Sequence, residues 1–532
     1  MKRITDTLRS VRSLGEAGLL RPIRPEKLLK VIGALRLYGA TPAAGFAAAA
    51  IARPDEVAII DERGTLTWAE LDERSNALAS ALFDIGVREG DCVAVMCRNH
   101  SGFVEATAAC AKLGSNALYL NTAFAAPQLV DVIAREDAKV IIYDSEFREV
   151  VEIGAPGRPR FVAWHEPGEQ LSDATLDSLI AASDGTNITT PTRAGRVIIL
   201  TSGTTGTPKG AQRETTGAMG SLIALLSAIP YRSGQTMVIA APMFHAWGFA
   251  NFAVALSLGD TVVLRRHFDP EVTLEMVART GASTLVVVPV MLQRMLECDP
   301  ARRDRHDISS LGIIAVSGSA VSGPLSARIM DHFGEILYNL YGSTEVSFAA
   351  IATPGDMRAA PGTVGRPPRG TVVKLFDDSD RPVQTGLTGR IFVGSGMLFE
   401  GYTGGGTKAV IEGLMATGDV GHFDADGRLF VDGRDDDMIV SGGENVFPQE
   451  VEAILTGHPG VADVTVLGVP DEAFGQRLRA VVVVRPGMTL DADEVKEYVK
   501  GHLARYKVPR DVVFVDQLPR TSTGKVLKRN LH

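Results

Sequence analysis

The chain has 532 residues, of which 45% are hydrophobic and 22% charged, and its formal net charge is -9. At ~150 residues per domain this length predicts three or four structural units, and the acidic balance argues against nucleic acid as a general partner. No apolar run reaches the ~18 to 20 residues that span a bilayer. The four cysteines (Cys92, Cys97, Cys110 and Cys298) show no zinc-like pairing, so we expect reduced core thiols in a cytoplasmic protein.

The first forty residues differ from the rest, with nine Lys/Arg against three Asp/Glu, a balance of +6. Apolar residues at helical spacing predict two short amphipathic helices. No long apolar region follows the basic start, so this is not a secretory signal. A basic amphipathic segment can lie peripherally on an anionic membrane. Because Pro22 and Pro25 interrupt its short apolar face, we favour a helical arm, residues 1–50, packed on its own protein.

From about residue 52 the pattern alternates between strand and helix. Strands are expected at Val57–Ile60, Thr65–Trp68, Asp91–Cys97, Ala117–Leu120 and Val140–Tyr143, and helices at Ala69–Ile85, Phe103–Leu113 and Pro127–Arg135. Such alternation predicts parallel sheets covered by helices. Residues 165–194 are polar and are expected to form a loop-rich joint.

A phosphate-binding loop follows the apolar strand Val197–Leu200. Its sequence runs from Thr201 to Gly210 as Thr-Ser-Gly-Thr-Thr-Gly-Thr-Pro-Lys-Gly. Two glycines let backbone N–H groups approach an anion, the hydroxyls add donors, and Lys209 adds a positive charge. Pro208 stands where the common P-loop has its second glycine, so this is a different motif. A flexible linker is disfavoured because the segment directly follows a buried strand.

Further strands lead into turns of small or polar residues. Strands at Met237–Ala241, Thr261–Leu264 and Thr284–Val288, with a helix at Glu271–Arg279, precede two strand-and-turn segments at 313–324 and 336–345. In open α/β sheets ligands bind beyond the carboxyl ends of strands, so four polar strand exits together predict one binding site.

The last part of the chain changes character twice. Short strands separated by glycine-rich turns over residues 361–433 predict a small β subdomain, and a smaller α/β pattern follows. We therefore predict a large domain over residues 51–433 and a small C-terminal domain over residues 434–532.

Five motifs occur in a fixed order between residues 52 and 532. They are the loop at 201–210, Tyr341-Gly-Ser-Thr-Glu345, Thr417-Gly-Asp419, Gly433-Arg434 and Pro519-Arg-Thr-Ser-Thr-Gly-Lys525. In these motifs the chain resembles the adenylate-forming superfamily of acyl-CoA synthetases, firefly-type luciferases and nonribosomal-peptide adenylation domains. The resemblance implies an α/β fold with stacked, mainly parallel sheets and a β subdomain, followed by a small mobile α/β domain.

The chemistry of this family explains the residue types. A carboxylate attacks the α-phosphate of ATP and displaces pyrophosphate, so two anions must be neutralised and held in line. Glu345 is suited to bind Mg²⁺, which prefers hard oxygen ligands, and the Thr201 hydroxyl would add a further oxygen. Thr201 and Glu345 are therefore expected both as metal ligands and as catalytic residues.

The resemblance assigns further roles by position. Phosphate binding is expected of Thr201, Ser202, Gly203, Thr204, Thr205, Gly206 and Lys209. The adenine-facing segments match Gly318, Ser319, Ala320, Asn339, Tyr341 and Gly342, and the turn adds Ser343 and Thr344. Asp419 matches the ribose-binding carboxylate and Arg434 its basic neighbour. Lys525 matches the lysine that bridges acid and α-phosphate. His245 would border the acid's carboxylate, and with Trp247 and Phe249 it would line the acyl pocket.

The second half-reaction transfers the acyl group to a thiol and requires a different geometry. In this family the C-terminal domain rotates about a hinge, whose position Asp436 matches. Ser441, Gly442 and Gly443 match the pantetheine tunnel, where a missing side chain permits close approach. Many relatives carry a lysine at the position of Val440, so contacts of CoA there are in doubt.

The sequence therefore predicts an ATP- and Mg²⁺-dependent acid–CoA ligase that releases AMP and pyrophosphate. Fatty acid is the preferred substrate, because the predicted pocket is apolar and the basic arm could reach lipid. Aryl or short-chain acids, an acyl-AMP ligase that loads a carrier protein, a luciferase-type oxygenase, and a homodimer remain open. A catalytically dead scaffold is disfavoured, because the five motifs retain their charged residues.

Overall fold

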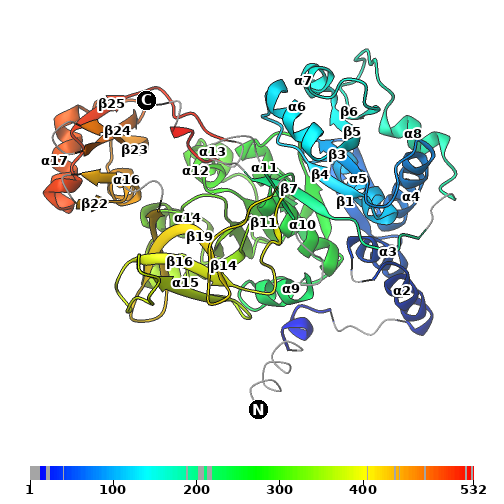
Figure 1. Ribbon diagram of the computed structural model, residues 1–532, viewed down its shortest axis with the longest axis horizontal. Coiled ribbons are helices and arrows are strands. Elements are labelled where there is room, and N and C mark those ends of the chain that lie inside the picture. The colour runs from blue at the N-terminus through cyan, green and yellow to red at the C-terminus, as the bar shows by residue number, and fades with distance from the viewer. Residues whose placement is uncertain are drawn as a thin grey trace. The chain divides into compact units, whose positions relative to one another are not determined.

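The computed structural model describes residues 12–19, 24–39, 41–186, 190–201, 209–212, 218–403, 405–435, 439–441, 444–471, 475–521, 524–528 and 531 (Figure 1). The chain forms two compact units. The first comprises residues 1–287, 294–315 and 396–407, and the second comprises residues 288–293, 316–395 and 408–532. Within the described ranges, no helix is both long and apolar enough to cross a bilayer.

The first unit contains a seven-stranded sheet in the order β17-β8-β7-β4-β3-β5-β6. Its strands are β3 (Cys92–Met96), β4 (Asn116–Tyr119), β5 (Ala138–Asp144), β6 (Arg160–Trp164), β7 (Val197–Thr201), β8 (Lys209–Gln212) and β17 (Gly401–Tyr402). The middle strands are parallel, whereas β8 and β17 add antiparallel ribbons at one edge. This edge carries the segment on either side of the predicted phosphate loop.

A second set of strands in this unit runs in the order β12-β11-β9-β10-β1-β2. These are β1 (Val57–Asp61), β2 (Gly64–Thr67), β9 (Thr236–Ile239), β10 (Thr261–Leu264), β11 (Thr284–Val287) and β12 (Ile313–Val316). Strands β1, β10, β9 and β11 pair in parallel, and β2 is antiparallel to β1. Helix α5 (Ser101–Leu113) is buried along almost its whole length because it packs against strands of both sheets.

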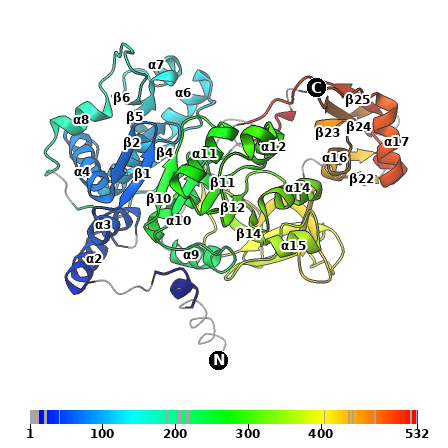
Figure 2. The ribbon, with the colours of Figure 1, turned by 180° about the vertical axis from the view of Figure 1, so that it is seen from behind.

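Other helices cover the outer faces. They are α2 (Pro25–Tyr38), α3 (Pro42–Ala52), α4 (Trp68–Asp84), α6 (Ala126–Arg135), α7 (Arg148–Gly154), α8 (Leu176–Ala182), α9 (Ala218–Leu226), α10 (Ala246–Leu258), α11 (Pro270–Thr280) and α13 (Pro300–Arg303). Helix α12 (Pro289–Glu297) begins in the second unit and ends in the first. Helices α6 and α7 close a core of apolar residues from β3, β4, β5 and β7. Helices α4 and α8 lie side by side in both views (Figures 1 and 2).

The second unit contains an antiparallel pair, β13 (Leu337–Ser343) and β14 (Ser347–Ala352), packed against α14 (Gly323–Phe333) and α15 (Pro354–Ala359). A five-stranded antiparallel sheet follows. It contains β15 (Val372–Phe376), β16 (Gly389–Gly394), β18 (Val410–Ile411), β19 (Leu414–Phe423) and β20 (Leu429–Arg434). This sheet is the small β subdomain that the sequence predicts over residues 361–433.

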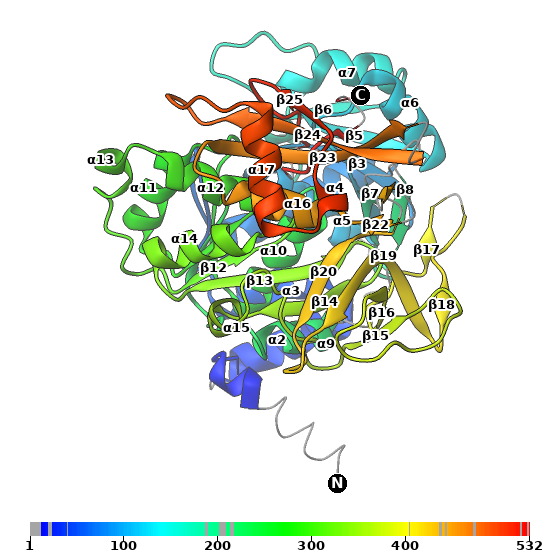
Figure 3. The same cartoon turned by 90° about the vertical axis from the view of Figure 1, so that its left-hand side faces the viewer.

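The C-terminal part of this unit is a second, mixed sheet. Its strands are β21 (Ile439–Ser441), β22 (Glu444–Val446), β23 (Val461–Asp471), β24 (Gly475–Val484) and β25 (Asp511–Phe514). Helices α16 (Pro448–Thr456) and α17 (Ala492–His502) pack on one face of it (Figure 3). The predicted α/β class is confirmed for both parts.

Three local predictions need correction or completion. Trp68 is not in a strand: Thr67 forms a capping box with Glu70 and begins α4 one residue earlier than expected. The stretch 165–194 is not all loop, because it contains α8, which Thr175 caps. In the arm, Pro25 occupies the first turn of α2, where a missing N–H costs nothing.

The arm also packs on its own protein at the positions that the structure describes. The Ser233 N–H donates to the Ala17 carbonyl (2.7 Å), and Lys27 Nζ donates to the Ala52 carbonyl (2.8 Å). The predicted boundaries of the three domains stay predictions.

Candidate active site

The Thr417-Gly-Asp419 motif lies in β19 and is folded by its own residues. The Thr417 hydroxyl donates to the Ile391 carbonyl (3.1 Å) and accepts the N–H of Asp419 (3.0 Å). Gly418 has φ of +87°, a conformation that a side chain would strain. In the β19–β20 ladder Asp419 is paired with Arg434, and Arg434 Nε lies 3.7 Å from Asp419 Oδ1. The Thr417-Gly-Asp419 and Gly433-Arg434 motifs therefore meet in one ion pair.

Tyr341 brings a third motif to this pair. Its hydroxyl donates to Asp419 Oδ2 over 2.5 Å, and burial together with the Asp419 charge raises the Tyr341 pKa. Asn339 is buried two residues earlier on β13, hence on the same face of that strand. Predicted adenine-facing and ribose-binding residues thus lie within hydrogen-bond reach of each other.

Asp419 is the carboxylate on which the other charged groups of this cluster act. Burial raises its pKa, while the Tyr341 hydroxyl and the charges of Arg434, Lys525 and Lys408 oppose that rise. Its side chain is 14% exposed. Lys408 is a site residue that sequence reasoning missed, because it lies in a glycine-rich stretch without a recognisable motif.

Lys525 is held in a closed hairpin. The Thr521 N–H donates to the Lys525 carbonyl (2.8 Å), and the Lys525 N–H donates to the Thr521 hydroxyl (3.1 Å). Arg520 clamps the hairpin from outside, since it donates to the Gly524 carbonyl and to both carboxylate oxygens of Asp463 (2.7 Å each). The Lys525 backbone is therefore fixed to β23.

Glu345 lies in the tight connection between β13 and β14. The Ser343 hydroxyl accepts the N–H groups of Glu345 (3.2 Å) and Val346 (3.4 Å). Gly342 is required because a Cβ there would lie 1.8 Å from the Ser347 carbonyl oxygen. Glu345 is almost buried, and Thr344 precedes it in the turn. A carboxylate beside hydroxyl oxygens is a donor set that fits Mg²⁺.

The segment Gly318–Ala320 lies between β12 and α14. Gly318 has φ of +100°, Ser319 is half-buried and Ala320 is exposed. The turn ends where Ser322 caps α14. Its predicted role toward adenine stays a prediction.

Predicted phosphate-loop residues belong to the first unit. Thr201 ends β7 and is paired with Lys209, which begins β8. Lys209 Nζ lies 5.3 Å from the ring centre of Tyr402. The remaining predicted residues of this loop, Ser202, Gly203, Thr204, Thr205 and Gly206, lie outside the described residues.

The predicted acyl-pocket residues also lie in the first unit. His245 is half-buried at the start of α10, and burial lowers its pKa to about 4, so its imidazole is neutral at physiological pH. The Trp247 indole N–H donates to the Val287 carbonyl (3.0 Å) inside the core. Phe249 is half-buried, with its ring 5.2 Å from that of Tyr119.

A second residue missed by sequence reasoning positions the strand exit before His245. The buried Asn99 amide donates to the Ala241 carbonyl (2.9 Å), and its oxygen accepts the Met243 N–H (2.8 Å). A lone asparagine after a strand gives no signal that would have found it.

Residues expected to serve the second half-reaction are mostly not described. Asp436, Gly442 and Gly443 lie outside the described residues. Ser441 ends β21, where its backbone pairs with that of Glu444.

A separate cluster of metal-ligand types, Cys97, His100 and Asp144, brings its ligand atoms within 4.8 Å of one another. The Gly102 N–H donates to His100 Nδ1 (3.1 Å), so Nε2 carries the proton that it shares with Asp144 Oδ1 (2.8 Å). Asp144 Oδ2 accepts the Arg98 N–H (2.9 Å). The cluster is a hydrogen-bonded core network rather than an open ligand set.

Comparison with known proteins gives matches along most of the chain. Residues 46–403 match the model of the AMP-binding enzyme family, and residues 450–525 match that of the AMP-binding enzyme C-terminal domain. An indoleacetate–CoA ligase of Aromatoleum aromaticum is 33% identical over 89% of this chain and 94% of its own. A fatty acid–[acyl-carrier-protein] ligase, ScoC, of Streptomyces coeruleorubidus is 31% identical over 90% and 93%.

Solved structures agree with these matches. The o-succinylbenzoate CoA synthetase MenE of Bacillus subtilis, in complex with its acyl-adenylate intermediate, is 27% identical, with a TM-score of 0.79 over 92% of this chain and 97% of its own.

The fold, the paired Asp419 and Arg434, and these matches define the class of AMP-forming acid–thiol ligases, which use ATP, Mg²⁺ and CoA. Within that class the chain belongs to the AMP-binding enzyme family of the adenylate-forming superfamily. The predicted family and enzyme class are therefore confirmed.

Proposed function

We propose that this ligase activates an aromatic or arylalkyl carboxylic acid and transfers it to CoA. The support is that the indoleacetate ligase and the succinylbenzoate synthetase both match almost the whole chain. The fatty-acid preference expected from the sequence has less support, since it is carried by the fatty acid–carrier ligase. The apolar residues on which that expectation depended, Trp247 and Phe249, are aromatic and suit a flat ring equally well.

The observation that carries the proposed nucleotide site is the contact of Tyr341 and Arg434 with Asp419. A carboxylate that accepts from a phenol and faces a guanidinium can exchange one of these partners for two ribose hydroxyls. The neighbouring aromatic ring of Tyr341 offers a flat surface for adenine. We assign Asp419 to the ribose, with Arg434 as its basic neighbour.

Charge neutralisation is the second task of the site. A carboxylate and a triphosphate repel each other until cations reduce that repulsion. We assign Lys525 to the approach of the acid to the α-phosphate, and Lys209 to the pyrophosphate that leaves. Lys525 suits this role, because its backbone is fixed by the hairpin while its ammonium group already acts on Asp419.

Glu345 with the hydroxyls of its turn would hold Mg²⁺, which supplies phosphate neutralisation. Ser343 has a positioning role there, because its hydroxyl fixes the backbone of Glu345. The neutral His245 can accept a hydrogen bond beside the acyl group without adding a charge. Asp436 as hinge and Ser441, Gly442 and Gly443 as the pantetheine path complete the proposal.

A substrate panel tests this function. Acid-dependent pyrophosphate release is measured with indoleacetate, benzoates, cinnamates and fatty acids of increasing length, with CoA or a carrier protein as the sole acceptor. We expect arylalkyl acids with CoA to give the highest kcat/KM. A panel in which long-chain acids exceed every aromatic acid by tenfold would refute the proposed substrate class, and thioester formed only on the carrier would refute CoA as the acceptor.

We also propose that helix α2 makes a peripheral membrane contact, because it packs on α3 with one face and exposes leucines on another. Leu28, Leu29, Leu35 and Leu37 are all exposed, Leu29 to 71%, beside the exposed Arg36. Basic charge next to apolar side chains matches an anionic lipid surface. Binding to vesicles with 30% phosphatidylserine that is lost in Leu29→Glu supports this contact, whereas binding equal to that of neutral vesicles, or a dimer that buries α2, contradicts it.

A further inference from the structure

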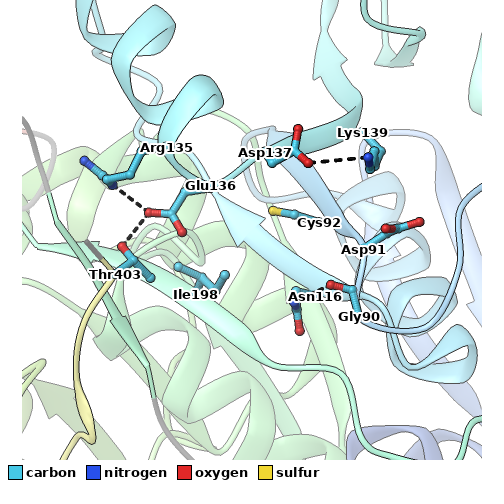
Figure 4. Close-up of a pocket in the computed structure, with 10 residues that line it drawn as sticks. All are labelled: Gly90, Asp91, Cys92, Asn116, Arg135, Glu136, Asp137, Lys139, Ile198 and Thr403. Carbon is cyan, nitrogen blue, oxygen red and sulfur yellow. Dashed lines mark hydrogen bonds and ion pairs between the residues drawn. The ribbon is translucent and has the colours of Figure 1, made fainter. Parts of the chain in front are cut away.

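A nearly buried carboxylate, that of Glu136, is linked through Thr403 to the start of β8. Glu136 follows α6, and its side chain is only 4% exposed. It lines a pocket of about 300 Å³ and accepts hydrogen bonds at the same oxygen, Oε1, from Arg135 Nε (2.8 Å) and from the Thr403 hydroxyl (Figure 4). Burying a charge is costly unless it is paired and hydrogen-bonded, so these contacts hold the carboxylate in one place.

Thr403 connects this carboxylate to the start of β8. Its hydroxyl donates to Glu136 and accepts the N–H of Gly210 (3.0 Å), while its own N–H donates to the Gly210 carbonyl (2.8 Å). Both bonding directions of the hydroxyl are therefore fixed. Gly210 must be glycine, because a Cβ would lie 2.7 Å from Thr403 Oγ1 and 2.7 Å from the Ile198 side chain.

Gly210 directly follows Lys209, the proposed phosphate-binding lysine. The preceding residues of the Thr403 segment, Gly401 and Tyr402, pair with β8, and the Tyr402 ring lies beside the Lys209 ammonium group. The segment 401–403 thus contacts the first two residues of β8 through the Tyr402 ring at Lys209 and through the hydroxyl and N–H of Thr403 at Gly210. Glu136 holds the Thr403 hydroxyl in turn. β8 lies between β17 and β7 in the sheet, and Lys209 is its first residue.

We propose that Thr403 and Glu136 are positioning residues for ATP: the carboxylate orients the Thr403 hydroxyl, which fixes Gly210 and thereby the backbone of Lys209. The inference rests on the proposed role of Lys209. Both residues are assigned an indirect role: Glu136 acts through Thr403, and Thr403 acts through Gly210 and Lys209. The positioned lysine acts where negative charge leaves with pyrophosphate, so the loss of either positioning group weakens ATP binding more than acid binding.

Paired substitutions separate positioning from packing. Thr403→Val keeps the shape and removes both hydrogen bonds, whereas Thr403→Ser keeps both. Glu136→Gln keeps an acceptor and removes the charge. Thr273→Val is the matched control, because the buried Thr273 hydroxyl donates to the Asp269 carbonyl in α11 (2.6 Å). For each full-length variant KM for ATP, KM for the acid, kcat and the thermal midpoint are measured.

We expect Thr403→Val to raise KM for ATP about tenfold with little change in KM for the acid, a loss typical of a hydrogen bond to a charged group. Thr403→Ser should restore it, and Glu136→Gln should give a smaller rise. In a Lys209→Ala background Thr403→Val should add less than about twofold, because residues that act through one another are not additive.

Three results would overturn the inference. The first is a KM for ATP in Thr403→Val equal to that in Thr273→Val, and the second is a full tenfold rise in KM for ATP when Thr403→Val is added to Lys209→Ala. The third is an equal rise of KM for ATP and KM for the acid in Thr403→Val. Failure of the proposed function gives a different result, namely wild-type protein that releases no pyrophosphate with any acid. In that case the affinity for ATP, measured by calorimetry on the same variants, still decides whether Thr403 acts through Lys209.

Discussion

Removing the Tyr341 hydroxyl tests the proposed ribose site most directly. Tyr341→Phe keeps the ring that we assign to adenine and removes only the donor, whose oxygen lies 2.5 Å from Asp419 Oδ2. Any change in ATP affinity then reports on the carboxylate rather than on stacking.

The magnitude follows from the surroundings of Asp419. A hydrogen bond to a charged group contributes about 1.5–3 kcal/mol, and each 1.4 kcal/mol is tenfold in an equilibrium constant. Since Arg434, Lys525 and Lys408 still act on Asp419, we expect the lower end, a rise of about tenfold in KM for ATP.

The same substitution should shift the pH dependence of the reaction. The Tyr341 hydrogen bond opposes the rise of the Asp419 pKa that burial causes, so its loss raises that pKa further. If the ionised carboxylate binds ribose, the acid limb of kcat/KM for ATP moves to higher pH.

Pyrophosphate release at saturating acid between pH 5 and 9 measures both effects. Tyr338→Phe, on the same strand and half-buried, is the matched control. An unchanged KM for ATP together with an unchanged acid limb in Tyr341→Phe would show that the Asp419 carboxylate is not the ribose ligand.

Three other substitutions have distinct expected results. Lys525→Ala should abolish adenylation yet leave thioester formation from pre-made acyl-adenylate largely intact, and equal loss of both half-reactions would remove its assigned role. Lys112 is 1% exposed, and its ammonium group donates to Asp72 Oδ1 (2.8 Å), Ser75 Oγ (2.7 Å) and Asn76 Oδ1 (2.7 Å). Lys112→Ala should therefore cost about 2 kcal/mol of stability, because it leaves acceptors unpaired and empties buried space. The unfolding midpoint should fall below that of the exposed control Lys139→Ala, and equal midpoints would contradict this. Burial lowers the pKa of His245 in the folded protein from 6.5 to about 4. The resulting contribution to the free energy of unfolding is fully present above pH 6.5 and is lost as the pH falls towards 4, at most about 3 kcal/mol. His245→Phe should flatten the profile of stability against pH between these two values, and an unchanged slope would contradict the shift.

The motifs could be predicted from the sequence because hydrogen bonds to residues next to them in the chain fix their conformation. Thr417 and Ser343 fix Asp419 and Glu345 locally, so these carboxylates were identifiable. Their juxtaposition with other groups depends on strand register. The β19–β20 ladder that pairs Asp419 with Arg434 is closed by a turn from Asp424 to Arg428, but it contains a register shift between Val420 and Gly421 that this turn does not specify. The family resemblance supplied that link.

Long-range contacts explain what the sequence could not reveal. Glu136 and Thr403 are 267 residues apart, and neither is in a recognisable motif. By contrast, α8 was missed although its signal was present, since Thr175 and Ser178 form a capping box inside a stretch judged by its polarity. For this stretch the capping residues indicate the helix, whereas the polar composition suggests a loop.

The anchoring of Lys525 has a consequence for limited proteolysis. Arg520 fastens the lysine hairpin to Asp463, and the described residues Val526 and Leu531 pack against a small cluster of Leu467, Val481 and Leu518. The core that β23 and β24 share with α16 and α17 is a separate cluster. Cleavage after Arg520 would therefore remove Lys525 together with Val526 and Leu531, while the core beneath α16 and α17 keeps its own residues. We expect such a clipped protein to lose the first chemical step before it loses the fold of this part.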